Sequence, residues 1–126
     1  MIQARELRLN NWVSDNGFPM RVVSLGKDYL YCDFDGNEGG LWEFDFANNK
    51  PKPIPLTEEI LLKCGFYYDT DYLTFCIPDC TIQLDNYADE GYMCIIFGEE
   101  LYLIKHLHQL QNLYFALIGK ELKVEL

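Results

Sequence analysis

Two cysteines and two histidines are the residue types in this chain that could bind a metal ion. Cys76 and Cys80 are close enough in sequence for a disulfide across a hairpin turn, or for four zinc ligands together with His106 and His108. The histidines are two residues apart on a predicted helix, on faces separated by about 200°. Zinc sites prefer C-x₂-C knuckles or helical pairs at i and i+4. We therefore predict half-buried strand cysteines and no metal or cofactor site.

Residues for acid–base or nucleophilic chemistry are few. The chain has two histidines and two serines, and it contains no G-x-S-x-G, glycine-rich phosphate loop or H-E-x-x-H motif. Glu43 and Asp45 share one face of a predicted strand, which makes a carboxylate pair possible. Alternating acids on a strand usually mark its solvated face. We therefore predict no catalytic residue and no enzyme; a small hydrolase using Glu43, Asp45 or His108 is the less favoured alternative.

The segment 106–118 predicts the long helix on which the rest of the chain packs. At about 100° per residue, one side is apolar and the other polar. The apolar side holds Leu107, Leu110, Leu113, Tyr114, Leu117 and Ile118, and the polar side His108, Gln109, Gln111, Asn112 and Ala116. Gly119 follows as a left-handed stop.

Phe115 lies at the far edge of this helix, beside His108 and Gln111. It is either buried between the two halves of the chain or exposed to bind a partner. We favour burial. If Phe115 is exposed, then His108, Gln111 and Phe115 form an interaction face.

Short strands flank this helix in the predicted α+β fold. Residues 1–47 predict an N-terminal β meander or SH3-like partial barrel, and residues 48–56 a stiff proline-rich connector. Residues 57–126 predict a helix capped by Thr57 and ended by Gly65, an antiparallel sheet, and the long helix packed on that sheet. The strands are predicted at 7–13, 20–25, 29–34, 41–46, 72–77, 80–84, 92–97 and 101–104, with an edge strand at 120–126. All 126 residues are predicted to form a single domain.

The net charge of the chain limits the classes of partner that it is expected to bind. The net charge is −10, with 5 basic and 8 acidic residues in 1–50 and 5 and 12 in 51–126. Such a chain is repelled by phosphate backbones and anionic lipid, so we do not expect nucleic acid as a partner. A basic surface could form only from a few residues such as Arg5, Arg8 and Arg21. The charged amino terminus lacks the apolar run of a signal peptide, and no stretch is apolar enough to span a bilayer. With five irregularly spaced cysteines, we expect free thiols and a cytoplasmic location.

Three segments carry a resemblance. ELRLNNWV at 6–13, PIPLTEEILLKCGF at 53–66 and HLHQLQNLYFALIGKEL at 106–122 resemble a family of small uncharacterised proteins from gut anaerobic bacteria, their prophages and mobile elements. The resemblance implies a cytoplasmic accessory protein linked to phage or mobile-element biology. It assigns no catalytic residue.

The leading functional hypothesis is a non-enzymatic accessory or protein-binding module, with an unknown protein partner or a homodimer. It rests on the thin catalytic inventory and the acidic, aromatic-rich composition. The alternative is an acidic decoy that occupies a nucleic-acid-binding host protein, which the charge and the resemblance suggest.

Overall fold

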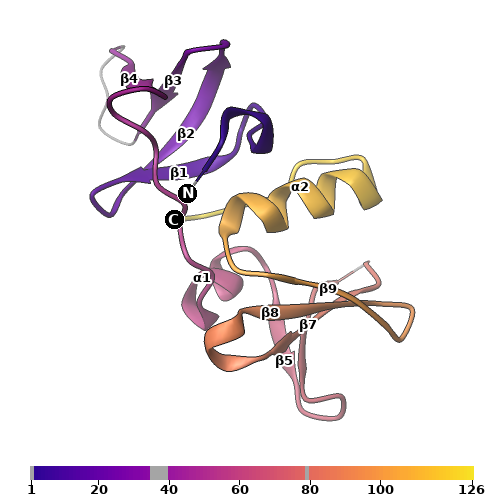
Figure 1. The fold of residues 1–126 in the computed structure, drawn as a ribbon. Coiled ribbons are helices and arrows are strands. Elements are labelled where there is room, and N and C mark those ends of the chain that lie inside the picture. The colour runs from indigo at the N-terminus through magenta and orange to yellow at the C-terminus, as the bar shows by residue number, and fades with distance from the viewer. Residues whose placement is uncertain (1, 35–39, 79) are drawn as a thin grey trace. The chain divides into compact units, whose positions relative to one another are not determined.

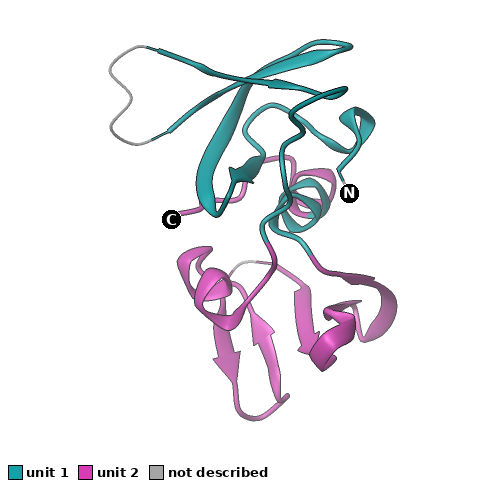
Figure 2. Ribbon diagram, turned by 60° about the vertical axis from the view of Figure 1, so that its left-hand side comes forward, with its two compact units in different colours: residues 1–54, 106–113 teal, residues 55–105, 114–126 magenta. Residues whose placement is uncertain are grey.

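Two antiparallel sheets and a long C-terminal helix make up most of the regular structure (Figure 1). The computed structural model describes residues 2–34, 40–78 and 80–126. Contacts divide the chain into two compact units, each built from two segments (Figure 2). Unit 1 comprises residues 1–54 and 106–113, and unit 2 comprises residues 55–105 and 114–126. One of the sheets curls into a half-barrel, and the predicted α+β class is confirmed.

The sheet of unit 1 is the predicted N-terminal meander. Its strands are β1 (Trp12–Asp15), β2 (Phe18–Leu25), β3 (Tyr29–Asp33) and β4 (Trp42–Asp45), paired in the order β1-β2-β3-β4. Asn16 and Gly17 both have positive φ, as a two-residue hairpin turn requires. The inward residues of these strands form an apolar core with the N-terminal segment: Ile2, Leu7, Val13, Met20, Val22, Leu30, Cys32 and Phe44.

The predicted strand at 7–13 is wrong over residues 7–11. The 3-10 turn η1 (Ala4–Glu6) precedes this range, and Asn10 within it has a φ of +74°, so the strand begins only at Trp12. The side chain of Asn11 causes the difference, because its Oδ1 accepts a hydrogen bond from the Arg8 amide at 2.7 Å. Such local side-chain bonds compete with extended structure.

The proline-rich connector belongs to the β-structure of unit 1 over part of its length. Lys52 exchanges two backbone hydrogen bonds with Ser14 of β1, both 2.9 Å long. In an extended chain, alternate residues direct their backbone groups to the same side. Prolines at 51, 53 and 55 therefore remove donors on one side only and leave those of Lys52 and Leu56 available. Within this connector, the compact units divide between residues 54 and 55.

Unit 2 contains the second meander. Helix α1 (Glu58–Lys63) precedes β5 (Tyr67–Asp69), β6 (Thr74–Cys76), β7 (Ile82–Asn86), a 3-10 turn η2 (Ala88–Glu90), β8 (Tyr92–Ile96) and β9 (Glu99–Ile104). Both predicted caps of α1 are confirmed. The Thr57 hydroxyl accepts from the Ile60 amide at 3.2 Å. Gly65 has a φ of +89°, and the Phe66 amide donates back to the Leu61 carbonyl.

Two strand predictions in unit 2 are corrected. The range 72–77 is not one strand. The Asp69 side chain accepts hydrogen bonds from the amides of Asp71 and Tyr72 and turns the chain there, so that β5 and β6 form a hairpin around this turn. Residues 120–126 form no described strand. The Glu125 amide there donates to the carbonyl of Lys63, one of the last carbonyls of α1, which the helix itself leaves unpaired.

Helix α2 (Leu107–Ile118) occupies the predicted place, and Gly119 follows with a φ of +80°. Its buried residues differ from the predicted stripe. Leu107, Leu110 and Leu113 are buried as expected, but Leu117 is 47% exposed. His108 and Gln111, on the predicted polar side, are each only 1% exposed. The buried face of α2 is therefore rotated from the predicted one and includes the polar residues His108 and Gln111.

At 12 residues, α2 is the longest helix in the described ranges. None of the helices there combines the length and the hydropathy that a bilayer crossing requires.

Two glycines of unit 2 test how tightly the second meander is built. Both Gly91 and Gly98 have positive φ, but an added Cβ would lie 2.5 Å from the Ile104 carbonyl oxygen at Gly91, whereas no atom lies within 4 Å at Gly98. We predict that Gly98→Ala costs about 1 kcal/mol of unfolding free energy through backbone strain. Gly91→Ala should cost at least about 2 kcal/mol more, because β9 must move. Urea denaturation of both variants measures the difference, and equal costs would contradict the close approach.

Candidate functional site

The polar side of α2 is bonded to the N-terminal segment of unit 1. The side-chain amide of Gln111 donates to the Asn10 carbonyl at 2.9 Å and accepts from the Trp12 amide at 2.8 Å. On the other side, Val22 of β2 bonds the backbone of Asn10 and Asn11. Gln111 therefore occupies the position that a neighbouring strand would take beside the start of β1.

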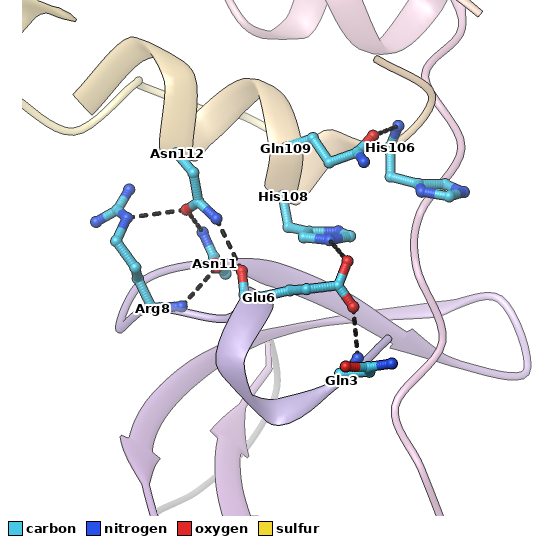
Figure 3. A network of polar contacts seen from close by, with 8 residues as sticks. All are labelled: Gln3, Glu6, Arg8, Asn11, His106, His108, Gln109 and Asn112. Carbon is cyan, nitrogen blue, oxygen red and sulfur yellow. Dashed lines mark hydrogen bonds and ion pairs between the residues drawn. The ribbon is translucent and has the colours of Figure 1, made fainter. Parts of the chain in front are cut away.

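Asn112 forms the second set of contacts (Figure 3). Its Oδ1 accepts from Arg8 Nε and from Asn11 Nδ2, both at 2.9 Å, and its Nδ2 donates to the Glu6 carbonyl at 2.8 Å. Arg8 also donates through Nη2 to the Gln111 carbonyl at 3.2 Å. We call these contacts of Gln111 and Asn112 the helix clasp. These hydrogen bonds replace the ones to water that the same polar groups lose on folding.

His108 is the least satisfied member of this region. Neither ring nitrogen has a hydrogen-bond partner among the described residues, and Nε2 lies 3.9 Å from Glu6 Oε1, too far for a hydrogen bond. The ring stacks on His106 with centroids 5.8 Å apart (Figure 3 shows both). Burial, and then the neighbouring His106, lower the pKa of His108 to about 4 against the opposing effect of Glu6. His108 is therefore neutral at pH 7.

The three residues of the predicted interaction face differ in exposure. His108 and Gln111 are buried within unit 1, whereas Phe115 is 40% exposed. The cause is the helix clasp, which uses the polar side of α2 for contacts with the protein's own N-terminal segment. The sequence predicts no contact between α2 and the N-terminal segment for Arg8, Asn11 or Asn112, which take part in the helix clasp. Polar residues at i, i+3 and i+4 of an otherwise apolar helix are the sequence signal for such contacts.

The cysteines considered as metal ligands are free thiols that differ in burial. All five cysteines are free; Cys76 is buried and Cys80 is half-buried. Burial raises the pKa of Cys32 and Cys64 to about 12, so these thiols stay protonated at pH 7. In the ranges that the structure describes, no three His, Cys, Asp or Glu residues are grouped as metal ligands.

Glu43 and Asp45 of β4 are each used locally. Glu43 accepts a hydrogen bond from the Tyr31 hydroxyl at 3.0 Å. Asp45 accepts from the Ala47 amide and from Asn48 Nδ2, both at 2.8 Å, and these bonds hold its pKa below the usual range. Both acids lie at solvent and His108 is buried, so the three do not converge on one cleft.

A pocket of about 550 Å³ opens in unit 2, and its size is in the usual range for binding sites. It is lined by residues of α1, of the β5–β6 hairpin and of the end of β7: Glu58, Leu62, Tyr68, Leu73, Phe75, Asp85 and Asn86. Phe75 is buried and packs edge-on against Tyr68 and Tyr92, with centroids 5.1 and 6.2 Å apart. Leu62 and Leu73 are 58% and 64% exposed. We call this site the α1–hairpin pocket.

The sequence did not reveal this pocket. Its residues come from four separate elements, and the sequence predicts a strand at Leu73, which lies in a turn. Leu73 has a φ of +57°. A leucine at positive φ is strained, and a turn position of this kind usually holds glycine or asparagine.

Comparison with known proteins gives no guide to the site: no family model matches the chain, and neither the curated proteins nor the solved structures yield a match.

The buried neutral His108 predicts a specific pH dependence. Its pKa is about 4 when folded and near 6.5 when unfolded, so below pH 6.5 the unfolded chain binds a proton that the folded chain does not. Its contribution is therefore complete above pH 6.5 and is lost as the pH falls toward 4. The loss should reach about 3 kcal/mol, following the size of the shift.

The measurement is the unfolding free energy of wild type and His108→Phe by urea denaturation between pH 7 and 4. Phenylalanine keeps a ring but cannot titrate, while the carboxylates remain common to both proteins. The variant should gain about 3 kcal/mol relative to wild type across this range. A constant difference between the two proteins would show that His108 does not titrate as described.

Proposed function

We propose that this protein is a non-enzymatic accessory module that binds another protein through the α1–hairpin pocket. The observation that carries the proposal is the exposed, strained Leu73 at the rim of an aromatic-floored pocket. An aliphatic side chain that is held in solvent at a strained backbone position does not help folding. Local conflicts of this kind are expected at functional sites.

The composition of the pocket supports a protein partner. Leu62 and Leu73 provide apolar surface that a partner side chain would cover, and Tyr68 and Phe75 form an aromatic floor. Aromatic and aliphatic residues clustered in a pocket are typical of the centre of a protein interface. The local use of Glu43 and Asp45, together with the buried neutral His108, supports a binding role over a catalytic one.

The prophage or mobile-element setting and the cytoplasmic location stay predictions from the resemblance and the composition. The acidic decoy rests on the net charge of −10 and on the resemblance, so it stays a prediction and is not part of the proposal. A homodimer likewise stays a prediction.

The test uses a random peptide display library panned on the folded protein, followed by binding measurements with the enriched peptides. Leu73→Asn should weaken their binding at least about tenfold, the effect of losing one well-packed contact residue. The same change should raise the unfolding free energy by up to about 1 kcal/mol, because asparagine tolerates positive φ. Weaker binding by a more stable protein could not be attributed to unfolding.

The chain offers a matched control at the turn between β8 and β9. Phe97 is also large, apolar and at positive φ, with a φ of +52° and 84% exposure, but it does not line the pocket. Phe97→Asn should give a similar gain in stability and leave peptide binding unchanged. If the library yields no binding peptide, or if Leu73→Asn binds the enriched peptides like wild type, the proposed function is wrong.

A further inference from the structure

We propose that the α1–hairpin pocket receives an arginine side chain of its partner, flanked by apolar residues that cover Leu62 and Leu73. This inference rests on the proposed function and names the chemistry of the same site. It follows from the charges, the aromatic rings and the shape of the pocket, which are considered in turn below.

Among the described residues that line the pocket, the charged ones are Glu58 and Asp85, and none is a lysine, arginine or histidine. Neither side chain forms an ion pair or a hydrogen bond within the described part of the chain. The adjacent Glu59, in contrast, pairs with Lys63 at 3.3 Å. The lining therefore carries negative charge with no internal cation to balance it, and a cationic group is its electrostatic complement.

The effect of this charge reaches an aromatic residue that packs against the lining. Tyr92 does not line the pocket, but its ring packs edge-on against Phe75, which does. Burial raises the pKa of Tyr92, and the charge of Glu58 raises it further. On the neighbouring segment, the pKa of Tyr87 is raised first by its hydrogen bond to Glu100 and, among other groups, by Asp85. A cation at the pocket would enter a region where negative charge already acts on nearby rings.

The aromatic rings favour arginine over lysine. Tyr68 is 48% exposed and stands edge-on to Phe75, so part of its ring is open to a ligand. A guanidinium group is planar and weakly hydrated, and it can stack on a ring while donating to a carboxylate. An ammonium group is strongly hydrated and acts as a point charge, so it gains less from a site that is half apolar.

The size and the rim of the pocket favour a peptide segment. A volume of about 550 Å³ exceeds the needs of one side chain, and Leu62 and Leu73 extend the apolar surface beyond the acids. An arginine with apolar neighbours would therefore fill the site. The net charge of −10 would also accelerate the approach of a basic segment at low salt.

The experiment uses the strongest peptide from the display library and three synthetic forms of it. In one form arginine is retained, in another it is replaced by lysine, and in the third by citrulline, which has the same shape but no charge. Citrulline should weaken binding at least about tenfold, and lysine several-fold, as expected for a desolvated charge-assisted contact. Binding of the arginine form should weaken as salt is raised from low to physiological strength.

Protein variants locate the effect. Glu58→Gln and Asp85→Asn should each weaken the arginine peptide about five- to tenfold and reduce its preference over citrulline, because each removes one unit of complementary charge. Glu59→Gln is the matched control, since it changes the next residue of the same helix outside the lining and should bind like wild type. Circular dichroism checks that all three variants are folded.

The outcomes separate this inference from the proposed function. If the enriched peptides contain no arginine, if lysine or citrulline binds as tightly, or if the two acidic variants bind like wild type, the arginine inference is wrong. The proposed function still stands in these cases when Leu73→Asn weakens binding. If Leu73→Asn has no effect or no peptide is enriched, both are wrong.

Discussion

The hydrogen bonds of the buried Gln111 side-chain amide on α2 are the constraint on which unit 1 depends. Gln111 is 1% exposed, and its amide bonds the backbone on both sides of Asn11. A buried amide without partners would cost about 1–3 kcal/mol, and the backbone groups of residues 10 and 12 would carry a similar penalty. Each side of the contact therefore requires the other, and the helix must present these residues for β1 to begin at Trp12.

This constraint explains why unit 1 is built from two distant segments. Residues 106–113 group with residues 1–54 because their side chains complete the hydrogen bonding of the N-terminal turn and of β1. The same contacts leave His108 buried with neither ring nitrogen bonded to a described residue. A helix surface that is committed to its own chain is not available to a partner, which directs attention to the α1–hairpin pocket of unit 2.

Local signals in the sequence predicted much of the fold. Thr57, Gly65 and Gly119 mark helix ends through short-range hydrogen bonds and positive φ. Each of these features is decided within a few residues, so the pattern of residue types is sufficient to recognise it.

The remaining features depend on distant residues. Gln111 looks like a solvent-facing residue until Asn10 and Trp12, about 100 positions away, are placed beside it. The alternating residues at 120–126 read as a strand, but their backbone pairs with the end of α1. The pocket could not be predicted for the same reason, since its residues come together only after the second meander has formed.

The helix clasp is tested most directly by hydrogen exchange of the Trp12 amide. In wild type, this amide donates to Gln111 Oε1 and should be protected. In Gln111→Met, which keeps the length of the side chain but not its acceptor, exchange at Trp12 should accelerate at least about tenfold, the effect of losing a bond of about 1.4 kcal/mol. Gln109→Met, a change of the same kind two residues earlier on α2, should leave it protected, as should amides of β7 in all three proteins. Equal exchange at Trp12 in wild type and Gln111→Met would contradict the account.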